Sequence, residues 1–330
     1  MNNELITEEE LRKSNEIITK IKNYYDERIV GQKNLQTSLL VCLLAKGHIL
    51  LESVPGLAKT TAAKVLTDAV DGKFSRIQCT PDLLPSDIIG TQIFNYTKNT
   101  FETKIGPIYG NFVLLDEINR SSAKTQSATL EAMQEHQITI GGQIYKLPEP
   151  FIVIATQNPI EQEGTYLLAE AQLDRFLIKE KVYYPTADEE VEVLNRIEKN
   201  VFENNKSILK LDDLKFLQEL TKKVYVDDSI KKYIANIILA TRCPFNYIPK
   251  NLAEYISLGS STRGSIAFLE CSKAVALLNG RTHVIPEDIK SLRYSILRHR
   301  ISLNFSAIAD NIPVEQIIDS LVGAIPTPWD

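Results

Sequence analysis

Short apolar runs alternate with helical patterns along the first half of the chain, and few folds accommodate such an order. It is the βαβ signature of a parallel sheet whose strands are joined by helices. The run Phe112–Asp116 is apolar up to its last residue, as expected for a strand that is covered on both faces. The expected strands are His48–Glu52, Lys73–Cys79, Phe112–Asp116, Phe151–Ala155 and Arg175–Val182.

Helical patterns lie between these strands and then replace them. In the first half we expect helices over Thr60–Val70 and Ser122–Gln137, besides one near the N-terminus. After Pro185 each expected helix begins near an Asp, Thr or Pro, residue types that favour a helix start. These helices are Asp188–Glu198, Asp213–Lys223, Asp228–Arg242, Thr262–Leu278 and Pro286–Arg300. The sequence therefore predicts an α/β core over residues 1–186, with a central parallel five-stranded sheet, and a small all-helical lid domain over residues 187–330.

Two segments of the core have the pattern of inserted β-hairpins. Ile138–Tyr145 alternates on either side of Gly141-Gly142, a two-residue turn signal. Gly90–Ile105 alternates in the same way around Thr97–Thr100. Either hairpin could handle a substrate or could be surface decoration, and the sequence leaves both interpretations open.

Composition and sequence pattern disfavour several classes of protein. Lys and Arg number 37 against 42 Asp and Glu, which gives a net charge of -5 and disfavours a nucleic-acid partner. The four cysteines are scattered without a CxxC pair, which argues against a zinc site or a disulfide framework. The N-terminus lacks the pattern of a signal peptide, and the most apolar stretch, Ser38–Leu51, is too short for a membrane span. We therefore expect a cytoplasmic protein.

The first strand runs into a candidate phosphate-binding loop. The segment Ser53-Val54-Pro55-Gly56-Leu57-Ala58-Lys59-Thr60-Thr61 connects it to a helix, which is the context that such a loop requires. The helix N-terminus offers free N–H groups to an anion, Lys59 would contact the β- and γ-phosphates, and the Thr60 hydroxyl would bind Mg²⁺. The pattern GxxxxGK[ST] is incomplete, because Ser53 and Ala58 stand where it has glycine. For this loop alone, the alternative is an ordinary helix start with a solvated lysine.

Two further strands end in polar side chains. Asp116 and Glu117 follow one strand, and Asn158 follows the strand Phe151–Ala155. In parallel sheets, ligands bind beyond the carboxyl ends of the strands, where the phosphate loop also lies. Asp116 would hold Mg²⁺, Glu117 would orient and deprotonate the attacking water, and Asn158 would bind the γ-phosphate or the water. Taken alone, Asn158 before Pro159 could instead be a turn residue.

Together these segments resemble the MoxR family of AAA+ ATPases, from about Ile29 to the C-terminus. Ala58 is usual in that family, whereas Ser53 and Ala169 depart from its pattern. The segments that carry the resemblance are Ile29-Val30-Gly31-Gln32, Val54-Pro55-Gly56-Leu57-Ala58-Lys59-Thr60, Leu115-Asp116-Glu117-Ile118-Asn119-Arg120, Ala155-Thr156-Gln157-Asn158-Pro159, Ala171-Gln172-Leu173-Asp174-Arg175-Phe176 and Arg298-His299-Arg300.

The resemblance implies a P-loop AAA+ fold, ATP and Mg²⁺ as ligands, a hexameric ring and a client protein, often one with a von Willebrand factor A domain. It implies that Val30, Gly31 and Gln32 lie near the adenine. Arg175 resembles the arginine finger that reaches a neighbouring subunit's γ-phosphate, with Arg120 as the alternative. Arg263 resembles the sensor-2 arginine of the lid, which contacts the phosphates.

Three other functions are compatible with parts of this pattern. A metal-chelatase ATPase subunit has a similar core and would differ mainly in its partner proteins. A nucleic-acid motor should have a basic pore hairpin, but Gln137–Lys146 carries one basic residue, Lys146. A non-hydrolysing, nucleotide-gated scaffold is favoured by Ser53 alone. The sequence does not identify the client.

Overall fold

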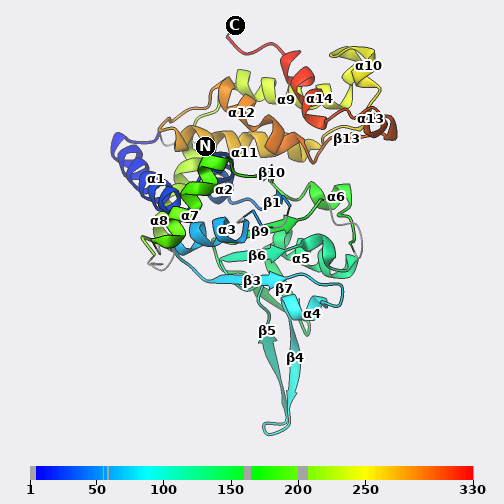
Figure 1. Ribbon diagram of the computed structural model, residues 1–330. Helices are drawn as coiled ribbons and strands as arrows, with labels where there is room; N and C mark the ends of the chain where they lie inside the picture. The colour runs from blue at the N-terminus through cyan, green and yellow to red at the C-terminus, as the bar shows by residue number, and fades with distance from the viewer. Residues whose placement is uncertain (1–4, 55, 58, 160–164, 200–206, 330) are drawn as a thin grey trace.

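A computed structural model describes residues 5–54, 56–57, 59–159, 165–199 and 207–329 of the chain (Figure 1). Its centre is a five-stranded parallel sheet with the strand order β10-β1-β9-β6-β3. The predicted five-stranded sheet is confirmed, and every strand end lies within three residues of the one expected. The strands are β1 (Ile49–Glu52), β3 (Phe74–Gln78), β6 (Phe112–Asp116), β9 (Ile152–Gln157) and β10 (Ile178–Lys181).

Helices cover both faces of this sheet. Successive side chains along a strand point to opposite faces, so the apolar strands pack against helices on both sides. In β1, Leu51 belongs to a cluster of buried apolar side chains that includes residues of the first three helices. Its neighbour Leu50 belongs to a second cluster, which includes residues of α5. The helices of the core are α1 (Glu8–Arg28), α2 (Lys33–Leu44), α3 (Lys59–Asp68), α4 (Pro85–Ile89), α5 (Ala123–Glu135) and α6 (Glu170–Leu173). A central strand such as β6 is therefore buried along its whole length, as its composition predicts.

Two segments link the core to the C-terminal helices. Helix α7 (Ala187–Glu198) is followed after a gap by α8 (Leu211–Lys223), which packs against α2 and α11. Strand β11 (Leu209–Lys210) pairs with β2 (Val70–Asp71), so this part of the chain also contacts the α/β core. The domain boundary at residue 186 stays a prediction.

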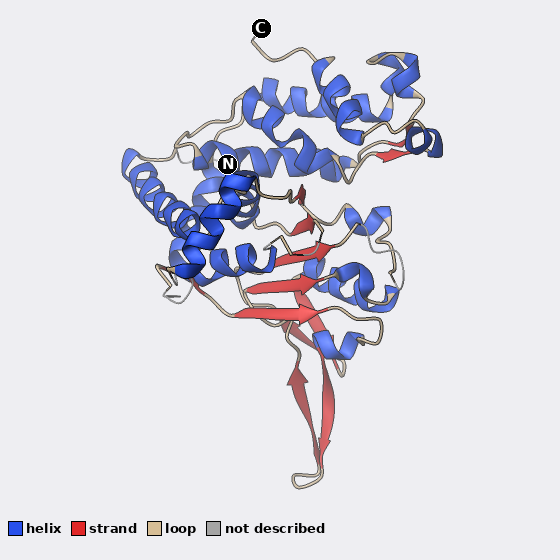
Figure 2. Ribbon diagram, in the orientation of Figure 1, coloured by secondary structure: helices blue, strands red, loops and turns tan. Residues whose placement is uncertain are grey.

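A helical layer lies beside strand β10, at the top of Figure 1 and Figure 2. The expected helices α9 and α11 begin and end at the predicted residues. Helix α12 ends at Leu297 rather than Arg300, because the chain turns there toward the sheet. The elements of this layer are α9 (Asp228–Arg242), α10 (Lys250–Ala253), β12 (Ile256–Leu258), α11 (Thr262–Leu278), α12 (Pro286–Leu297), β13 (Ser302–Leu303), α13 (Phe305–Ala309) and α14 (Val314–Gly323).

One continuous cluster of buried apolar side chains joins this helical layer to the sheet. It includes Ile17 of α1, Leu51 of β1, Phe268 of α11 and Ile317 of α14. The lid therefore shares a hydrophobic core with the α/β part, so side-chain packing as well as the connecting chain holds the two together.

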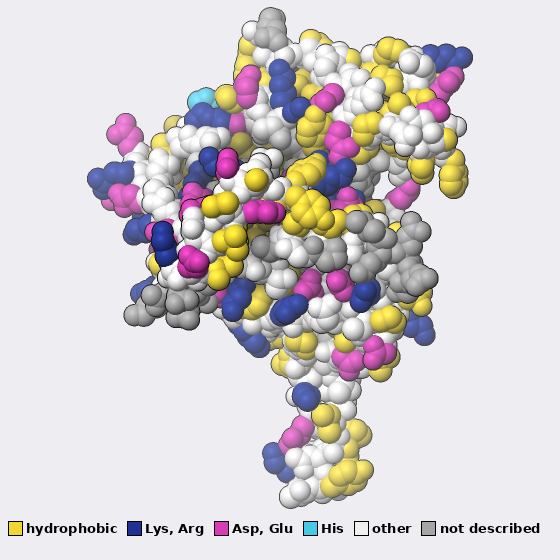
Figure 3. All heavy atoms as spheres, viewed as in Figure 1, with side chains coloured by type: hydrophobic (Ala, Val, Ile, Leu, Met, Phe, Trp, Pro, Cys, Tyr) yellow, Lys and Arg dark blue, Asp and Glu magenta, His cyan; other side chains and the backbone are white. Residues whose placement is uncertain are grey.

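Both expected hairpins are present. β7 (Gln137–Ile140) and β8 (Gln143–Lys146) pair around Gly141 and Gly142, whose φ angles of 57° and 81° favour glycine. β4 (Gly90–Asn95) and β5 (Thr100–Ile105) form a long hairpin that projects away from the body at the bottom of Figure 1. Apolar side chains are visible on it in Figure 3, and Tyr96 and Phe101 are 88% and 67% exposed.

A buried histidine should make the stability of this fold dependent on pH. Burial lowers the pKa of His48 to about 4, although its hydrogen bond to the Met133 carbonyl opposes that shift. Between about pH 6.5, the pKa of histidine in an unfolded chain, and pH 4, only the unfolded state takes up the proton. We expect His48 to reduce the free energy of unfolding by up to about 3 kcal/mol as the pH falls through this range.

Chemical denaturation at pH 7 and pH 4.5 measures this effect. Since other groups also titrate, the comparison is with His48→Gln, which should be less stable at pH 7 but should lose less stability on acidification. Equal losses in both proteins would show that His48 is not the group responsible.

Candidate active site

The phosphate loop leaves the carboxyl end of β1 and leads into α3. Lys59 is the first residue of α3, and its Nζ donates to the Ser53 carbonyl at 3.1 Å. The lysine is 8% exposed, so its charge is held inside the loop rather than in solvent. Gly56 has a φ of 84°, a conformation that favours glycine. Of the predicted loop residues, Val54 packs on the core, whereas Pro55 and Ala58 lie outside the described residues.

Asp116 at the end of β6 lies beside the start of α3. Its Oδ2 accepts a hydrogen bond from Thr60 Oγ1 at 3.4 Å, and its Oδ1 accepts one from Thr156 Oγ1 at 2.8 Å. Thr156 Oγ1 also accepts a hydrogen bond from the backbone N–H of Glu117 at 2.9 Å. One buried hydroxyl therefore fixes both acidic residues relative to β9.

The oxygens of Thr60 and Asp116 suit Mg²⁺. They are a hydroxyl and a carboxylate oxygen within hydrogen-bond distance of each other, and this hard cation prefers oxygen ligands. No group of three or more His, Cys, Asp or Glu that could hold a metal occurs in the described part of the chain. The residues therefore fit an ion that keeps several waters and phosphate oxygens, as Mg²⁺ does, better than one held in a protein cage.

Glu117 has a backbone conformation that is uncommon for its residue type. Its φ and ψ are 57° and 52°, in the left-handed region, which turns the chain sharply after β6. Its Oε2 accepts a hydrogen bond from Gln78 Nε2 at 3.1 Å and lies 3.3 Å from Arg120 Nε. The carboxylate is thus held beside Asp116 at the open edge of the sheet.

Asn158 follows β9, the strand between β1 and β6, and is buried. It lines a hollow of about 660 Å³ together with Asn119, Glu52 and Lys179. Burial opposes the charge of Glu52, but the ion pair with Lys179 and the hydrogen bond from Gln157 outweigh it and lower the pKa of this carboxyl. The end of the sheet next to the phosphate loop is therefore polar and charged.

A second hollow, of about 550 Å³, opens on the other side of the phosphate loop. Val30 and Gln32 line it, and Gln32 Nε2 donates to the Tyr183 carbonyl at 2.8 Å. Between them Gly31 has a φ of 64°, and a Cβ there would collide with the Glu189 carboxylate. Residues of the phosphate loop and of α7 also line it, among them Gly56, Leu57, Thr61, Val193 and Ile197, and Arg28 and Glu190 contribute charged groups. This mostly apolar hollow suits a flat heterocyclic base.

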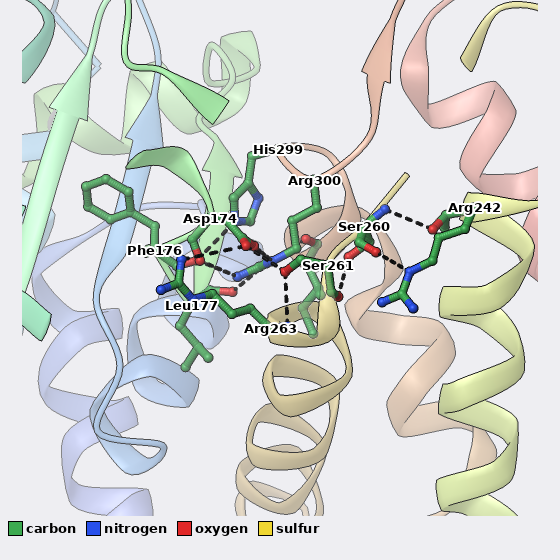
Figure 4. Close-up of polar contacts among 11 residues, drawn as sticks. Asp174, Phe176, Leu177, Arg242, Ser260, Ser261, Arg263, His299 and Arg300 are labelled. Atoms are coloured by element: carbon green, nitrogen blue, oxygen red, sulfur yellow. Dashed lines mark hydrogen bonds and ion pairs between the residues drawn. The ribbon is translucent and has the colours of Figure 1, made fainter. Parts of the chain in front are cut away.

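Arg175 and Arg263 lie at the opposite edge of the sheet. Both line a hollow of about 290 Å³ with Gly47 and His48, which precede β1, whereas the phosphate loop follows that strand. A four-residue strand is about 13 Å long. Within this chain Arg263 lies 3.9 Å from Asp174, as Figure 4 shows, and its expected role as a sensor-2 arginine stays a prediction.

Arg175 and Arg120 differ in their surroundings. Nε of Arg175 is buried without a hydrogen-bond partner among the described residues, whereas Arg120 pairs with Glu117 of its own site. An unsatisfied buried donor costs about 1–3 kcal/mol, so such a group commonly has a functional reason. Which of the two arginines acts on a neighbour stays a prediction.

Three residues of the site were not anticipated from the sequence. They are Arg76 and Gln78 of β3, and Thr156 of β9. Arg76 Nη2 donates to Asp116 Oδ2 at 2.7 Å and thus shares that oxygen with Thr60. Arg76 and Gln78 are two residues apart in the expected strand Lys73–Cys79, and this spacing could have indicated two polar side chains on one face of it.

Comparison with known proteins agrees with this geometry. The family model for the ATPase family associated with various cellular activities (AAA) matches residues 48–178, and that for the AAA lid domain matches residues 250–321. Chaperone MoxR1 of Mycobacterium tuberculosis is 44% identical over 300 residues, which are 91% of this chain and 79% of the relative. The chain belongs to the MoxR family of AAA+ ATPases.

Other relatives of this MoxR-family chain match over nearly its whole length. The uncharacterized protein YeaC of Bacillus subtilis is 44% identical over 94% of this chain and 95% of its own. The crystal structure of an ATPase candidate from Cytophaga hutchinsonii has a TM-score of 0.90 and 45% identity, covering 97% of each chain. In the described residues of this family member, no helix is both long and apolar enough to cross a membrane.

Thr156 provides a test of how this MoxR-family site is built. Thr156→Val keeps the shape of the side chain but leaves Asp116 Oδ1 and the Glu117 N–H without their hydroxyl partner. Unsatisfied buried groups cost about 1–3 kcal/mol each, so the free energy of unfolding should fall by that order. Thr156→Ser, which keeps the hydroxyl, is the matched control. If denaturant unfolding gives equal stabilities for both variants, the hydroxyl does not secure the two acidic residues.

Proposed function

We propose that this chain hydrolyses ATP as one subunit of a ring and uses the energy to remodel a partner protein. The observation that carries this proposal is the convergence of five polar side chains on the carboxyl edge of one parallel sheet. They are Lys59, Thr60, Asp116, Glu117 and Asn158. Ligands of such sheets bind beyond this edge, and helix N-termini bind phosphate.

In this proposal the base of ATP occupies the hollow lined by Val30 and Gln32, and its phosphates lie against the N-terminus of α3. Lys59 contributes positive charge at the β- and γ-phosphates, and Asn158 orients the γ-phosphate or the water. Mg²⁺, held by Thr60 and Asp116, would neutralise charge that develops on the phosphate oxygens. Glu117, at the same edge of the sheet, would orient a water for attack on the γ-phosphate and accept its proton.

The site is incomplete within one subunit, because Arg175 and Arg263 lie at the amino edge of the sheet. We infer that they reach the nucleotide of the neighbouring subunit, where positive charge stabilises the transition state. A head-to-tail contact of this kind closes into a ring when the rotation allows it. A hexamer is the ring size that the family resemblance implies.

The partner protein would be contacted by the hairpins. The β4–β5 hairpin projects from the body and exposes Tyr96 and Phe101, and exposed apolar groups of this kind mark interaction sites. Chaperone MoxR1, by its name, acts on other proteins, which supports a client for this chain as well. A client with a von Willebrand factor A domain is the partner that the family resemblance implies.

Steady-state ATP hydrolysis over a range of protein concentrations tests the proposal. Specific activity should rise with concentration, because the subunit interface completes the site, and should reach a plateau once assembly is saturated. A fluorescent ADP analogue reports nucleotide binding under the same conditions. If the protein binds nucleotide and assembles but shows no hydrolysis, the nucleotide-gated scaffold is the better interpretation and the proposed motor is wrong.

A further inference from the structure

The lid contacts the core through an ion pair between Asp174 and Arg300. Asp174 follows α6, and Arg300 lies in the turn after α12. Arg300 Nε donates to Asp174 Oδ1 at 2.8 Å. The Arg300 side chain is 2% exposed and the Asp174 side chain is 15% exposed. Ser261, which caps the N-terminus of α11, donates to Asp174 Oδ2 at 2.7 Å. Figure 4 shows these side chains converging between the two parts of the chain.

The same guanidinium holds the backbone on both sides of Arg175. Nη2 of Arg300 donates to the carbonyls of Asp174 and Phe176 at 3.4 and 2.7 Å. Nη1 donates to the Leu177 carbonyl at 3.2 Å and to the Ile296 carbonyl at 2.7 Å. All five N–H groups of an arginine are thus used, four of them on core oxygens.

His299 adds a further bond from the lid. Its Nε2 donates to the Phe176 carbonyl at 3.0 Å, beside the bond from Arg300. The segment that carries Arg175 is therefore fixed by two consecutive residues of the lid. The peptide groups on either side of Arg175 cannot rotate, and so cannot redirect its side chain, unless these hydrogen bonds break or the lid moves with them.

We propose that Asp174 and Arg300 are positioning residues, which hold the lid against this segment and thereby fix the direction in which Arg175 points. This inference rests on the proposed function, since it assigns Arg175 to the neighbour's nucleotide. A buried ion pair is a weak source of stability compared with apolar packing, so the fold alone does not require a charged pair here. The planar fork of arginine fits several fixed acceptors at once, which lysine does not do.

Two substitutions test this coupling. Asp174→Asn removes the charge but keeps the size of the side chain, and Arg300→Lys keeps the charge but loses the fork. Each should lower kcat by about 10²-fold, the loss that a displacement of roughly 1 Å can cause, while leaving the nucleotide affinity of the same subunit unchanged. Combined with Arg175→Ala, neither should lower the rate further, because the arginine that they position is absent.

Mixed assemblies give a readout that a purely structural defect would not produce. A Glu117→Gln subunit lacks hydrolysis but retains Arg175, whereas an Asp174→Asn subunit retains its own catalytic groups. Mixing the two should restore ATP hydrolysis well above that of either protein alone, because the Asp174→Asn site then receives a correctly placed arginine. Arg175→Ala mixed with Glu117→Gln is the positive control and tests the proposed function itself.

Recovery with Arg175→Ala but none with Asp174→Asn would overturn this inference and leave the proposed function intact. Should Asp174→Asn not fold, Ser261→Ala removes one hydrogen bond to the same carboxylate together with the cap of α11, and it should show a smaller loss that mixing also restores. Asp288→Asn is the matched control, since Asp288 is a buried carboxylate that pairs with Arg281 inside the lid. It should lower the melting temperature without changing kcat, and an equal loss of kcat would contradict the inference.

Discussion

Arg175→Ala should lower the rate of ATP hydrolysis by about 10³–10⁵-fold, the effect of removing an arginine that stabilises the transferring phosphoryl group. The affinity of the variant for nucleotide in its own subunit should stay unchanged, because Arg175 lies at the opposite edge of the sheet from Lys59. Steady-state phosphate release and titration with a fluorescent ADP analogue measure the two quantities separately.

Arg175→Lys is the matched variant for this prediction. Lysine keeps the positive charge but lacks the planar fork, so we expect an intermediate rate. A variant Arg175→Ala that turns over normally, or that loses nucleotide affinity in dilute protein, would show that Arg175 does not act between subunits. In that case Arg120, which contacts Glu117, becomes the stronger candidate.

Glu117→Gln is expected to lower hydrolysis by about 10²–10⁴-fold, the range for loss of a general base. The amide retains the size of the side chain and an oxygen that can accept the hydrogen bond from Gln78, so the loop should keep its conformation. ATP binding should persist, and ATP should then hold the proposed ring assembled for longer than in the wild type.

Single-turnover hydrolysis and size-exclusion chromatography in ATP test this prediction. Glu131→Gln, on the exposed side of α5, is the control and should behave as the wild type. Hydrolysis at the wild-type rate by Glu117→Gln would remove this carboxylate from the mechanism and direct attention to the other polar groups of the same edge.

Much of the fold was predictable because its strands and lid helices have regular patterns. Helix α9 opens at Asp228, and β6 is apolar until its final carboxylate, so both were predicted at their observed bounds. Helix α2 was not predicted, because most of its residues from Leu35 to Leu44 are buried and no polar face gives the pattern a helical period. Helix α14 was missed as well, although Pro313 precedes it as a start signal.

Site residues that directly follow a strand could be predicted from the sequence. Residues that reach the site only through tertiary contacts could not. Asp116 and Thr60 are 56 residues apart, and their expected proximity is seen. The direction of Arg263 could not be derived, since it depends on how α11 is placed against Asp174. The contacts of Arg76 and Thr156 likewise depend on the order of strands in the sheet, which the sequence does not specify.

The shared hydrophobic core of lid and sheet has a mechanical consequence. Because apolar side chains pack continuously from α1 through the sheet to α14, a force on the lid is transmitted to the strands as through one solid body. Separating the two parts would expose that apolar surface to water. In the proposed ring, movement driven by nucleotide would then appear chiefly as rotation between neighbouring subunits, each of them a rigid body with the β4–β5 hairpin at one end and the lid at the other.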